Sequence, residues 1–308
     1  MKQPKRLNKK LKIYYKGVYN MIKMIINVTD EDNDKNGFVC GDGSNFGILN
    51  IEGLESVNKN ILTSETSVKD GLVYHGEKKE AREITLEFET LTDTLNEELR
   101  DFFIKFLNND KRKKIVVELN NNKRKIYGYI KEWSFTNIYI YEPIRVNIIF
   151  LCVDPLFLNM SDFGQNIASI NNKFSFPLSI PINRGVITGY KRFNRKLNIQ
   201  NEGDYTTGII VVFKAIRGDV INPKITKVTT GEEINIVDTM QKGDTIKIET
   251  NIGKKTVFKN NINISNKLTR NSIYFQITKG RNIIEYNADE GYTNLDVYIY
   301  YTPTYGGI

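Results

Sequence analysis

The amino-acid sequence predicts a mainly β, β-rich α+β protein of two domains with a single packed helix. The chain has 308 residues, and single hydrophobic cores stop growing near roughly 250–300 residues, so two domains are the default expectation. Short stretches of alternating apolar and polar residues recur along the chain, as in strands with one solvated face. One stretch near residue 100 instead has the apolar spacing of an amphipathic helix.

Residues 1–20 are expected to be a basic, flexible extension. They contain many lysines and few apolar anchors, so they cannot bury enough surface to offset the entropy lost on ordering. The extension lacks a clean apolar core region and a small-residue cleavage site, so it does not fit a secretory signal. The extension is rich in basic side chains: Lys2, Lys5, Arg6, Lys9, Lys10, Lys12 and Lys16.

Residues 21–157 are expected to form the first domain. Asn36-Gly37 is a strong hairpin signal, and it predicts a polar turn over residues 30–37. Pro143 predicts an edge position or a bulge, because proline cannot donate to a strand ladder. Asp154-Pro155 closes the domain for the same reason. The strands are predicted over residues 24–28, 38–40, 48–54, 83–91, 115–119, 125–135 and 138–152.

The helix of this domain is predicted to begin at a capping box and to pack on the sheet. Thr94 and Glu97 have the spacing at which each side chain caps the other residue's backbone amide. Large apolar side chains then recur at helical spacing, and each contributes roughly 1.5–3 kcal/mol on burial. The predicted apolar stripe comprises Leu95, Leu99, Phe102, Phe103, Phe106 and Leu107.

Residues 158–308 are expected to form a second domain without a helix. Short strand-like runs alternate with glycine-containing turns, which is typical of an antiparallel sandwich or barrel. The segment 161–196 is ambiguous. The clearest strands are predicted over residues 209–213, 245–249, 273–277, 283–286 and 297–301.

The sequence offers no pattern for catalysis or metal binding. His75 is the sole histidine, and nothing around it suggests a Ser-His-Asp or Cys-His pair. Cys40 and Cys152 are too few and too far apart for a metal motif or a disulfide framework. Residues 32–37 match the first half of a calcium loop, but its twelfth position is Gly43 instead of glutamate. We therefore expect no cofactor and no metal.

Glycines and carboxylates also point to structure. Gly41, Gly43 and Gly47 are spaced one residue too widely for a dinucleotide fingerprint, and they lead into a strand instead of a helix. A tight turn explains them better. Glutamates on the strand faces give no spacing that selects a pair for glycoside hydrolysis.

The net charge of +8 leaves nucleic-acid binding as a weak alternative, since acidic residues are also numerous. The basic runs 111–114 and 123–125 lack interleaved aromatics for base stacking, so a solvated face or an acidic protein partner is favoured. No apolar run approaches the roughly 20 residues needed to cross a bilayer. Carbohydrate binding is the main alternative function. It is suggested by aromatic strand residues: Trp133, Tyr139, Tyr141, Tyr298, Tyr300, Tyr301 and Tyr305.

Two sequence motifs lie on either side of most of the predicted strands. FGILNIEGLE runs from Phe46 to Glu55, and YIYYTPTYGGI runs from Tyr298 to Ile308. With NEGDYTTG, VTTGEE, MQKGDTIKIET and TKGRNIIEY in order between them, the chain resembles the distal tail protein family of long-tailed phages. The matching positions are Gly47, Leu49, Ile51, Gly53, Leu54, Gly128, Asp154, Pro155, Gly203, Asp204, Tyr205, Gly231, Gly243, Asp244, Gly280, Asn282, Tyr301, Pro303 and Tyr305. Thr304 departs from the pattern, because relatives often carry a basic residue there.

The resemblance implies a structural protein without an active site. It implies a homo-oligomeric ring, typically six-fold, whose N-terminal domains continue the tail tube at the tail tip of a virion or phage-like particle. The C-terminal domains would be galectin-like sandwiches that hold fibres or receptor-binding proteins. The implied partners are the tail tube protein and a tail-tip hub protein, with DNA only passing through the channel and no membrane insertion. Synthesis in the host bacterial cytoplasm is also implied.

Overall fold

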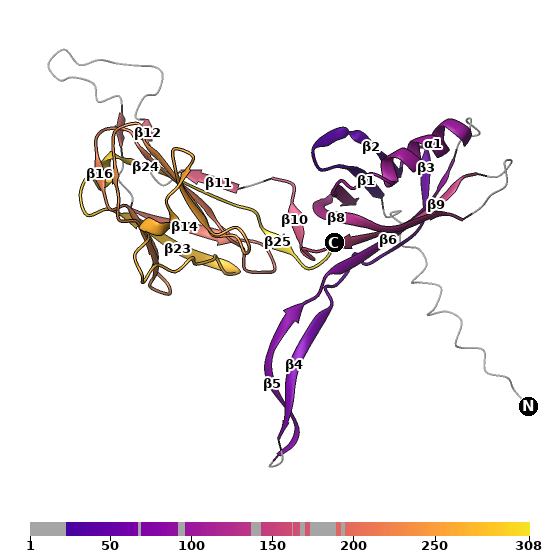
Figure 1. Cartoon of the computed structure of the whole chain (residues 1–308), viewed down its shortest axis with the longest axis horizontal. Helices are drawn as coiled ribbons and strands as arrows, with labels where there is room; N and C mark the ends of the chain where they lie inside the picture. The colour runs from indigo at the N-terminus through magenta and orange to yellow at the C-terminus, as the bar shows by residue number, and fades with distance from the viewer. Residues whose placement is uncertain are drawn as a thin grey trace, which may run out of the picture. The chain divides into compact units, whose positions relative to one another are not determined.

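The structure is a computed structural model that describes residues 23–66, 69–91, 96–136, 143–161, 163–166, 170–172, 189–191 and 195–308. Its described residues fall into two compact units. The first unit draws on Met1–Gly53, Glu83–Lys123 and Tyr127–Val153, and the second on Leu54–Arg82, Arg124–Ile126 and Asp154–Ile308. Figure 1 shows the strands and the helix α1. Several residues named above lie outside the described residues: the predicted extension 1–20, Thr94, Leu95, Tyr139 and Tyr141.

An antiparallel sheet forms the first unit, in the order β2-β1-β7-β8-β9-β6-β3. Its path begins at β2 and ends at β3, so these two are its edge strands. The bounds are β1 Met24–Asp30, β2 Asn33–Gly41, β3 Phe46–Glu52, β6 Arg82–Thr90, β7 Lys113–Leu119, β8 Asn122–Phe135 and β9 Arg145–Cys152.

The helix α1 spans Asn96–Leu107 and covers this sheet with aromatic side chains. Phe103, Phe106 and Leu107 are buried, which confirms this part of the predicted apolar stripe, whereas Leu99 and Phe102 are partly buried. The ring of Phe103 lies 5.4 Å from that of Phe38 and 5.5 Å from that of Phe88, measured between centroids. Burial of these rings from two strands and the helix makes the core of the unit.

One lysine of the predicted solvated run is buried, which corrects that prediction. The Lys113 side chain has no exposed surface, and its Nζ lies 2.6 Å from Asp30 Oδ1. It also donates to the Phe106 carbonyl at 2.8 Å and to Asn109 Oδ1 at 2.7 Å. Burial acts to raise the pKa of Asp30, but hydrogen bonds from Lys113 and Asn36 outweigh it and lower the pKa. The pair joins the end of α1 to β1 and β7.

The turn between β1 and β2 lies earlier than predicted. The strands pair from Ile25↔Gly41 through Thr29↔Gly37 to Asp30↔Asn33, so Glu31 and Asp32 make the turn. Gly37 lies inside β2, where a Cβ atom would come within 2.1 Å of the Val28 carbonyl oxygen. Glycine is therefore required there by close strand approach and not by turn geometry.

Pro143 also lies outside a strand, because β9 begins only at Arg145. The prediction that placed it inside the strand was wrong, and the missing proline amide accounts for the later start.

A sandwich of two antiparallel sheets forms most of the second unit. Their strand orders are β11-β24-β15-β20-β21-β22 and β14-β23-β17-β18. The first has bounds β11 Phe163–Asn166, β15 Ile210–Ala215, β20 Thr245–Glu249, β21 Thr256–Lys259, β22 Ile262–Asn263 and β24 Leu295–Tyr301. The second has bounds β14 Lys196–Asn201, β17 Lys224–Lys227, β18 Glu232–Asn235 and β23 Gly280–Asn287.

The two sheets enclose one hydrophobic core. Val211 and Phe213 of β15, Ile248 of β20, and Ile225 and Tyr286 of the second sheet all belong to it. Alternation along each strand places these side chains inward. The sandwich that was one of two predicted alternatives is thus the observed architecture.

The predicted strand at 273–277 does not form. Phe275 and Ile277 are buried, but Ile277 makes only an isolated bridge to Thr207. The apolar residues there serve the core without a ladder.

Smaller elements complete the second unit. The hairpin strands β4 and β5 pair only with each other. The strand β10 pairs with both β25 and β8. The bounds are β4 Lys59–Thr66, β5 Lys69–Lys79, β10 Phe157–Asn159, β12 Ile170–Asn172, β13 Gly189–Lys191, β16 Val220–Ile221, β19 Thr239–Met240, β25 Thr304–Tyr305, and 3-10 helices at Ser265–Lys267 and Tyr292–Asn294.

Candidate functional site

The two sequence motifs meet in the second unit. The C-terminal segment Thr304–Ile308 lies against Leu54, near the end of the first motif, and also against Pro155 and Gly203 through contacts described below. We name this arrangement the terminal clasp and define it as Leu54, Arg82, Arg124, Pro155, Phe157, Gly203–Tyr205 and Pro303–Ile308. Residues more than 200 positions apart in the sequence thus form one site, as shown by the Ile308 amide donating to the Leu54 carbonyl at 3.1 Å.

Arg82 is the buried cation of the terminal clasp. Only 4% of the residue is exposed. Its Nε donates to the Pro155 carbonyl at 2.9 Å, and its Nη2 donates to the Gly306 carbonyl. The guanidinium carbon lies 4.9 Å from the centroid of the Phe157 ring. A planar guanidinium with several fixed donors suits this simultaneous binding of two carbonyls and a ring.

Arg124 makes a second contact of the same kind. Its Nη1 donates to the Gly307 carbonyl, and its guanidinium carbon lies 3.7 Å from the centroid of the Tyr305 ring. Tyr305 pairs with Phe157 between β25 and β10. Strand pairing, cation–π stacking and a charge-assisted hydrogen bond therefore all fix the C-terminal segment.

Close packing against Glu55 requires glycine at position 307, just before Ile308. A Cβ atom on Gly307 would lie 1.7 Å from the Glu55 carbonyl oxygen. Gly306 donates its amide to Asp204 Oδ2 at 3.3 Å. No larger residue fits the position of Gly307 without moving the backbone at Glu55.

Gly203, Asp204 and Tyr205 hold the other side of the segment. The Asp204 amide donates to the Thr304 carbonyl at 2.8 Å, and a Cβ atom on Gly203 would lie 2.7 Å from the same oxygen. The Lys79 ammonium lies 3.8 Å from the centroid of the Tyr205 ring. The contact at Thr304 is made by its backbone, so the departure from the family pattern there does not remove it.

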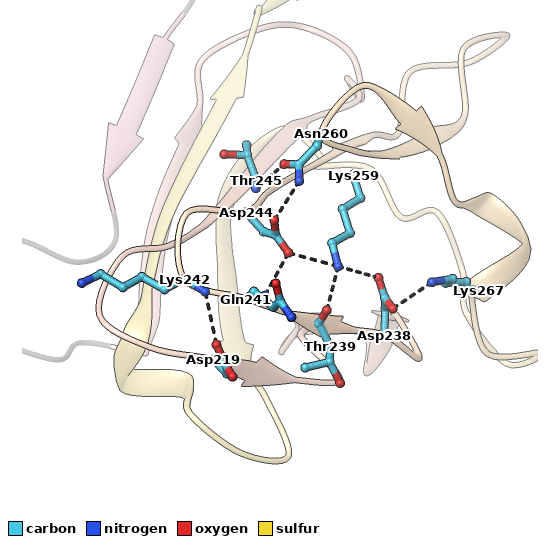
Figure 2. Close-up of polar contacts among 10 residues, drawn as sticks. All are labelled: Asp219, Asp238, Thr239, Gln241, Lys242, Asp244, Thr245, Lys259, Asn260 and Lys267. Atoms are coloured by element: carbon cyan, nitrogen blue, oxygen red, sulfur yellow. Dashed lines mark hydrogen bonds and ion pairs between the residues drawn. The ribbon is translucent and has the colours of Figure 1, made fainter.

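A second polar site lies at the turn that contains Asp244, and Figure 2 shows it. Lys259 Nζ contacts Asp244 Oδ2 at 3.1 Å, Asp238 Oδ2 at 3.2 Å and the Thr239 carbonyl at 2.7 Å. Lys267 binds the other oxygen of Asp238 at 2.8 Å. The network joins β19, β21 and the turn before β20.

The charges of this network shift one another's pKa values. Hydrogen bonds from the Asn260 side chain and the Gln241 amide lower the pKa of Asp244. Burial acts to lower the pKa of Lys259, but its hydrogen bonds to Asp244 and Asp238 outweigh this and raise it. Burial acts to raise the pKa of Asp238, but hydrogen bonds from Lys267 and Lys259 outweigh this and lower it. The charged forms of Asp238, Asp244 and Lys259 are therefore favoured in the folded state.

Replacing Lys259 by methionine is expected to destabilise the sandwich by about 1 kcal/mol at neutral pH, because charge-assisted hydrogen bonds are lost. Because the folded state lowers the pKa values of Asp238 and Asp244, their stabilisation is full above the ordinary carboxyl pKa of 3.8 and is lost as the pH falls below it. The raised pKa of Lys259 makes it present below 10.5 and lost above. Urea unfolding of wild type and variant between pH 3 and 11 measures this. A difference that stays constant across this range contradicts the assignment, and Lys247→Met on the exposed sheet face is the control.

The remaining family positions are structural and do not join either site. Gly53 adopts φ +86°, and a Cβ atom there would lie 2.1 Å from the Glu83 carbonyl oxygen. A Cβ atom on Gly128 would meet the Cys152 side chain. Three further glycines have positive φ: Gly231, Gly243 and Gly280. Asn282 is buried, and its side-chain amide donates to the Thr278 carbonyl. Leu49 is 44% exposed. The Tyr301 hydroxyl donates to the Gln200 carbonyl at 2.9 Å. Gly47 and Ile51 lie in β3, and Asp154 precedes β10.

The residues tested for chemistry have structural neighbours. His75 lies in strand β5, with its Nε2 2.6 Å from Ser64 Oγ, and no carboxylate is hydrogen-bonded to it among the contacts of the described residues. Asp34, of the partial calcium loop, pairs with Lys114 at 3.0 Å. Burial raises the pKa of the Cys40 thiol. In the described part of the chain, no group of three or more histidine, cysteine or acidic side chains is placed to hold a metal ion, and no helix there is long and apolar enough to cross a membrane.

The tyrosines that suggested carbohydrate binding are partly used inside the protein. Tyr305 belongs to the terminal clasp, and the Tyr301 hydroxyl donates to the Gln200 carbonyl in β14. Trp133 donates to Asn108 Oδ1 at 3.1 Å. Tyr300 is 39% exposed.

Comparison with known proteins shows which proteins this chain is similar to in sequence and in fold. Residues 202–305 match the family model described as "Siphovirus-type tail component, C-terminal domain". This part of the chain is therefore similar to the C-terminal domain of siphovirus-type tail components. No curated protein matches it in sequence.

Two solved structures are similar to nearly the whole fold of the chain. The crystal structure of the phage SPP1 Dit protein is similar with a TM-score of 0.61 and 12% identity, over 91% of this chain and 98% of that one. A chain of the phage P2 baseplate in its activated conformation with Ca is similar with a TM-score of 0.52 and 11% identity, over 92% of this chain and 98% of that one. These two likenesses show that the chain has a Dit-like fold.

Proposed function

We propose that this chain forms a closed ring, a hexamer, that continues the tail tube at its distal end and serves as a hub. The observation that carries the proposal is the pairing of the tail-component match over residues 202–305 with a Dit fold over 91% of the chain. The SPP1 Dit protein is described as a paradigm of hub adsorption apparatus in Gram-positive infecting phages.

The first unit supplies a physical route to a ring. Its sheet has two edge strands, β2 and β3, and unpaired edges favour pairing with another chain. A contact between two different surfaces of identical subunits closes into a ring when its rotation closes. Each contact is modest, but copies in one ring act together, so local concentration strengthens them.

The second unit would carry the partners. We propose that the sandwich holds fibre or receptor-binding proteins, while the ring contacts the tail tube protein and a tail-tip hub protein. DNA would only pass through the channel. The buried or stacked positions of Lys113 and Arg124 support this view, because these charges serve the fold and are not displayed to a nucleic acid.

Purified protein is expected to assemble into one closed species of about six copies, alone or with a tail-tip partner. Sedimentation velocity gives the mass, and negative-stain electron microscopy gives the closed outline. A protein that stays monomeric at high concentration, and that does not co-purify with tails, contradicts the proposal.

A further inference from the structure

Residues 303–308 are attached to the second unit in the way that a bound peptide is. We call these six residues the strap, and we call the other residues of the terminal clasp its acceptor. The hydrophobic core of the sandwich includes Tyr301 of β24, but none of the described residues 302–308 belongs to it. The attachment of the strap therefore depends on backbone contacts and on two arginines, and not on burial in that core.

The acceptor binds backbone groups along the whole strap. Strand β25 of the strap pairs with β10 (Figure 1), and the Asn159 amide donates to the Pro303 carbonyl at 3.1 Å. The Asp204 amide donates to the Thr304 carbonyl at 2.8 Å, and the Asp204 carboxylate accepts the Gly306 amide at 3.3 Å. Addition of an extended segment to a sheet edge through main-chain hydrogen bonds is a recurring mode of peptide recognition.

The acceptor also selects side chains. Arg124 lies over the Tyr305 ring at 3.7 Å and donates to the Gly307 carbonyl. A Cβ atom on Gly307 would lie 1.7 Å from the Glu55 carbonyl oxygen. The acceptor therefore fits an extended segment that has an aromatic residue followed by glycine.

Most of the acceptor is held in place by contacts that do not involve the strap. Arg82 is fixed by the Pro155 carbonyl and the Phe157 ring, and Asp204 pairs with Lys279 at 3.4 Å. Strand β10 has β8 as a second partner. When the strap leaves, β10 keeps β8 but gains an open edge, and open edges favour pairing with another strand.

The link between β24 and the strap allows the strap to leave alone. Strand β24 is paired with β11 and β15 over its own residues, Leu295–Tyr301. Pro303 has no amide to donate, so it cannot continue the ladder of β24. Thr302 accepts a hydrogen bond from the Thr207 hydroxyl at 3.0 Å, which holds the chain just before the strap begins.

We propose that the terminal clasp is a latch in which the strap is an exchangeable internal ligand. The acceptor takes either the strap or a separate extended peptide with an aromatic residue followed by two glycines. The tether gives the strap an effective concentration that is roughly millimolar for a short flexible link, so the closed state dominates. Opening the latch frees the Leu54 carbonyl, which accepts the Ile308 amide in the closed state. The inference does not depend on the proposed ring.

A labelled peptide with the sequence Pro-Thr-Tyr-Gly-Gly-Ile, that of residues 303–308, tests the exchange on the full chain. Gly307→Val is expected to displace the strap, because the new Cβ atom would overlap the Glu55 carbonyl oxygen. Fluorescence anisotropy is expected to show that the peptide binds this variant about tenfold or more tightly than the wild type, whose tethered strap competes with the peptide.

Two controls make the peptide result specific. A peptide with valine in place of the second glycine is expected to bind neither chain. Arg82→Ala/Gly307→Val is expected to lose the peptide that Gly307→Val binds, because Arg82 donates to the Gly306 carbonyl. A folded Gly307→Val variant that binds no peptide overturns the proposal. A Gly307→Val variant that loses the circular dichroism spectrum of the wild type also overturns it, since an exchangeable strap is not needed for folding.

Hydrogen exchange of the wild type gives a reading without any variant. The amides of Gly306 and Ile308 are expected to exchange about tenfold or more faster than the amides of β24 that are bonded to β15, because the strap opens without unfolding the sandwich. Equal exchange rates in the strap and in β24 would show that the strap leaves only when the sandwich unfolds, and that result overturns the latch.

Discussion

Replacing Lys113 by alanine is expected to destabilise the first unit by about 3–5 kcal/mol, because breaking a buried ion pair leaves its partner's charge uncompensated. Lys113 has no exposed side-chain surface and holds Asp30 at 2.6 Å. Its ammonium also lies 3.7 Å from the centroid of the Phe106 ring. The variant therefore loses a charge partner, two further hydrogen bonds and a cation–π contact at once. Chemical denaturation followed by Trp133 fluorescence measures the loss.

Two further variants make this result specific. Lys114→Ala removes the neighbouring charge, whose partner Asp34 has 68% of its side chain exposed, and is expected to cost under about 1 kcal/mol. Asp30→Asn/Lys113→Met removes both charges and is expected to recover part of the loss, since apolar replacements of buried pairs are often tolerated. A Lys113→Ala variant within 1 kcal/mol of wild type contradicts the buried pair.

Replacing Arg82 by alanine is expected to release the terminal clasp and to cost about 2–4 kcal/mol. Arg82 satisfies the carbonyls of Pro155 and Gly306 and covers the Phe157 ring. Each buried carbonyl left without a donor costs roughly 1–3 kcal/mol. The Ile308 amide donates to the carbonyl of Leu54, which precedes β4. We therefore expect the backbone amides of residues 54–58 and of the C-terminal segment to lose protection from hydrogen exchange together. Hydrogen exchange read by mass spectrometry measures both segments.

The control for this variant is Arg281→Ala. Arg281 is exposed and donates to the Asn198 side chain at 2.9 Å. Its loss is therefore expected to leave hydrogen exchange at residues 54–58 unchanged. Equal exchange in Arg82→Ala and wild type shows that the terminal clasp is not held by this residue.

Local patterns predicted the strands and the helix well where one face is buried. The alternation of Ile84, Leu86 and Phe88 and the stripe of Phe103 and Phe106 both record inward-facing side chains. The turn of β1 and β2 was misplaced, because Gly37 is required by the nearby Val28 carbonyl and not by a turn. Nothing in the sequence predicts this contact between Gly37 and the Val28 carbonyl.

The terminal clasp shows a limit of a different kind. Its ends were singled out by family resemblance, but their meeting in space was not predicted. Arg82 and Arg124 stand among other charged residues, and composition favours a solvated face for such residues. Only the carbonyls of Pro155, Gly306 and Gly307, distant in sequence, explain their burial or stacking. The hairpin was also missed, because apolar residues on both faces hide the period-two alternation that predicts a half-buried strand.

The central claim is that this chain is the ring-forming hub at the distal end of a tail. Cryo-electron microscopy of intact tails that carry it tests the claim most directly. A closed ring of this fold in line with the tail tube is the expected result. Density for this fold elsewhere in the particle, or as single copies around a different ring, would contradict it.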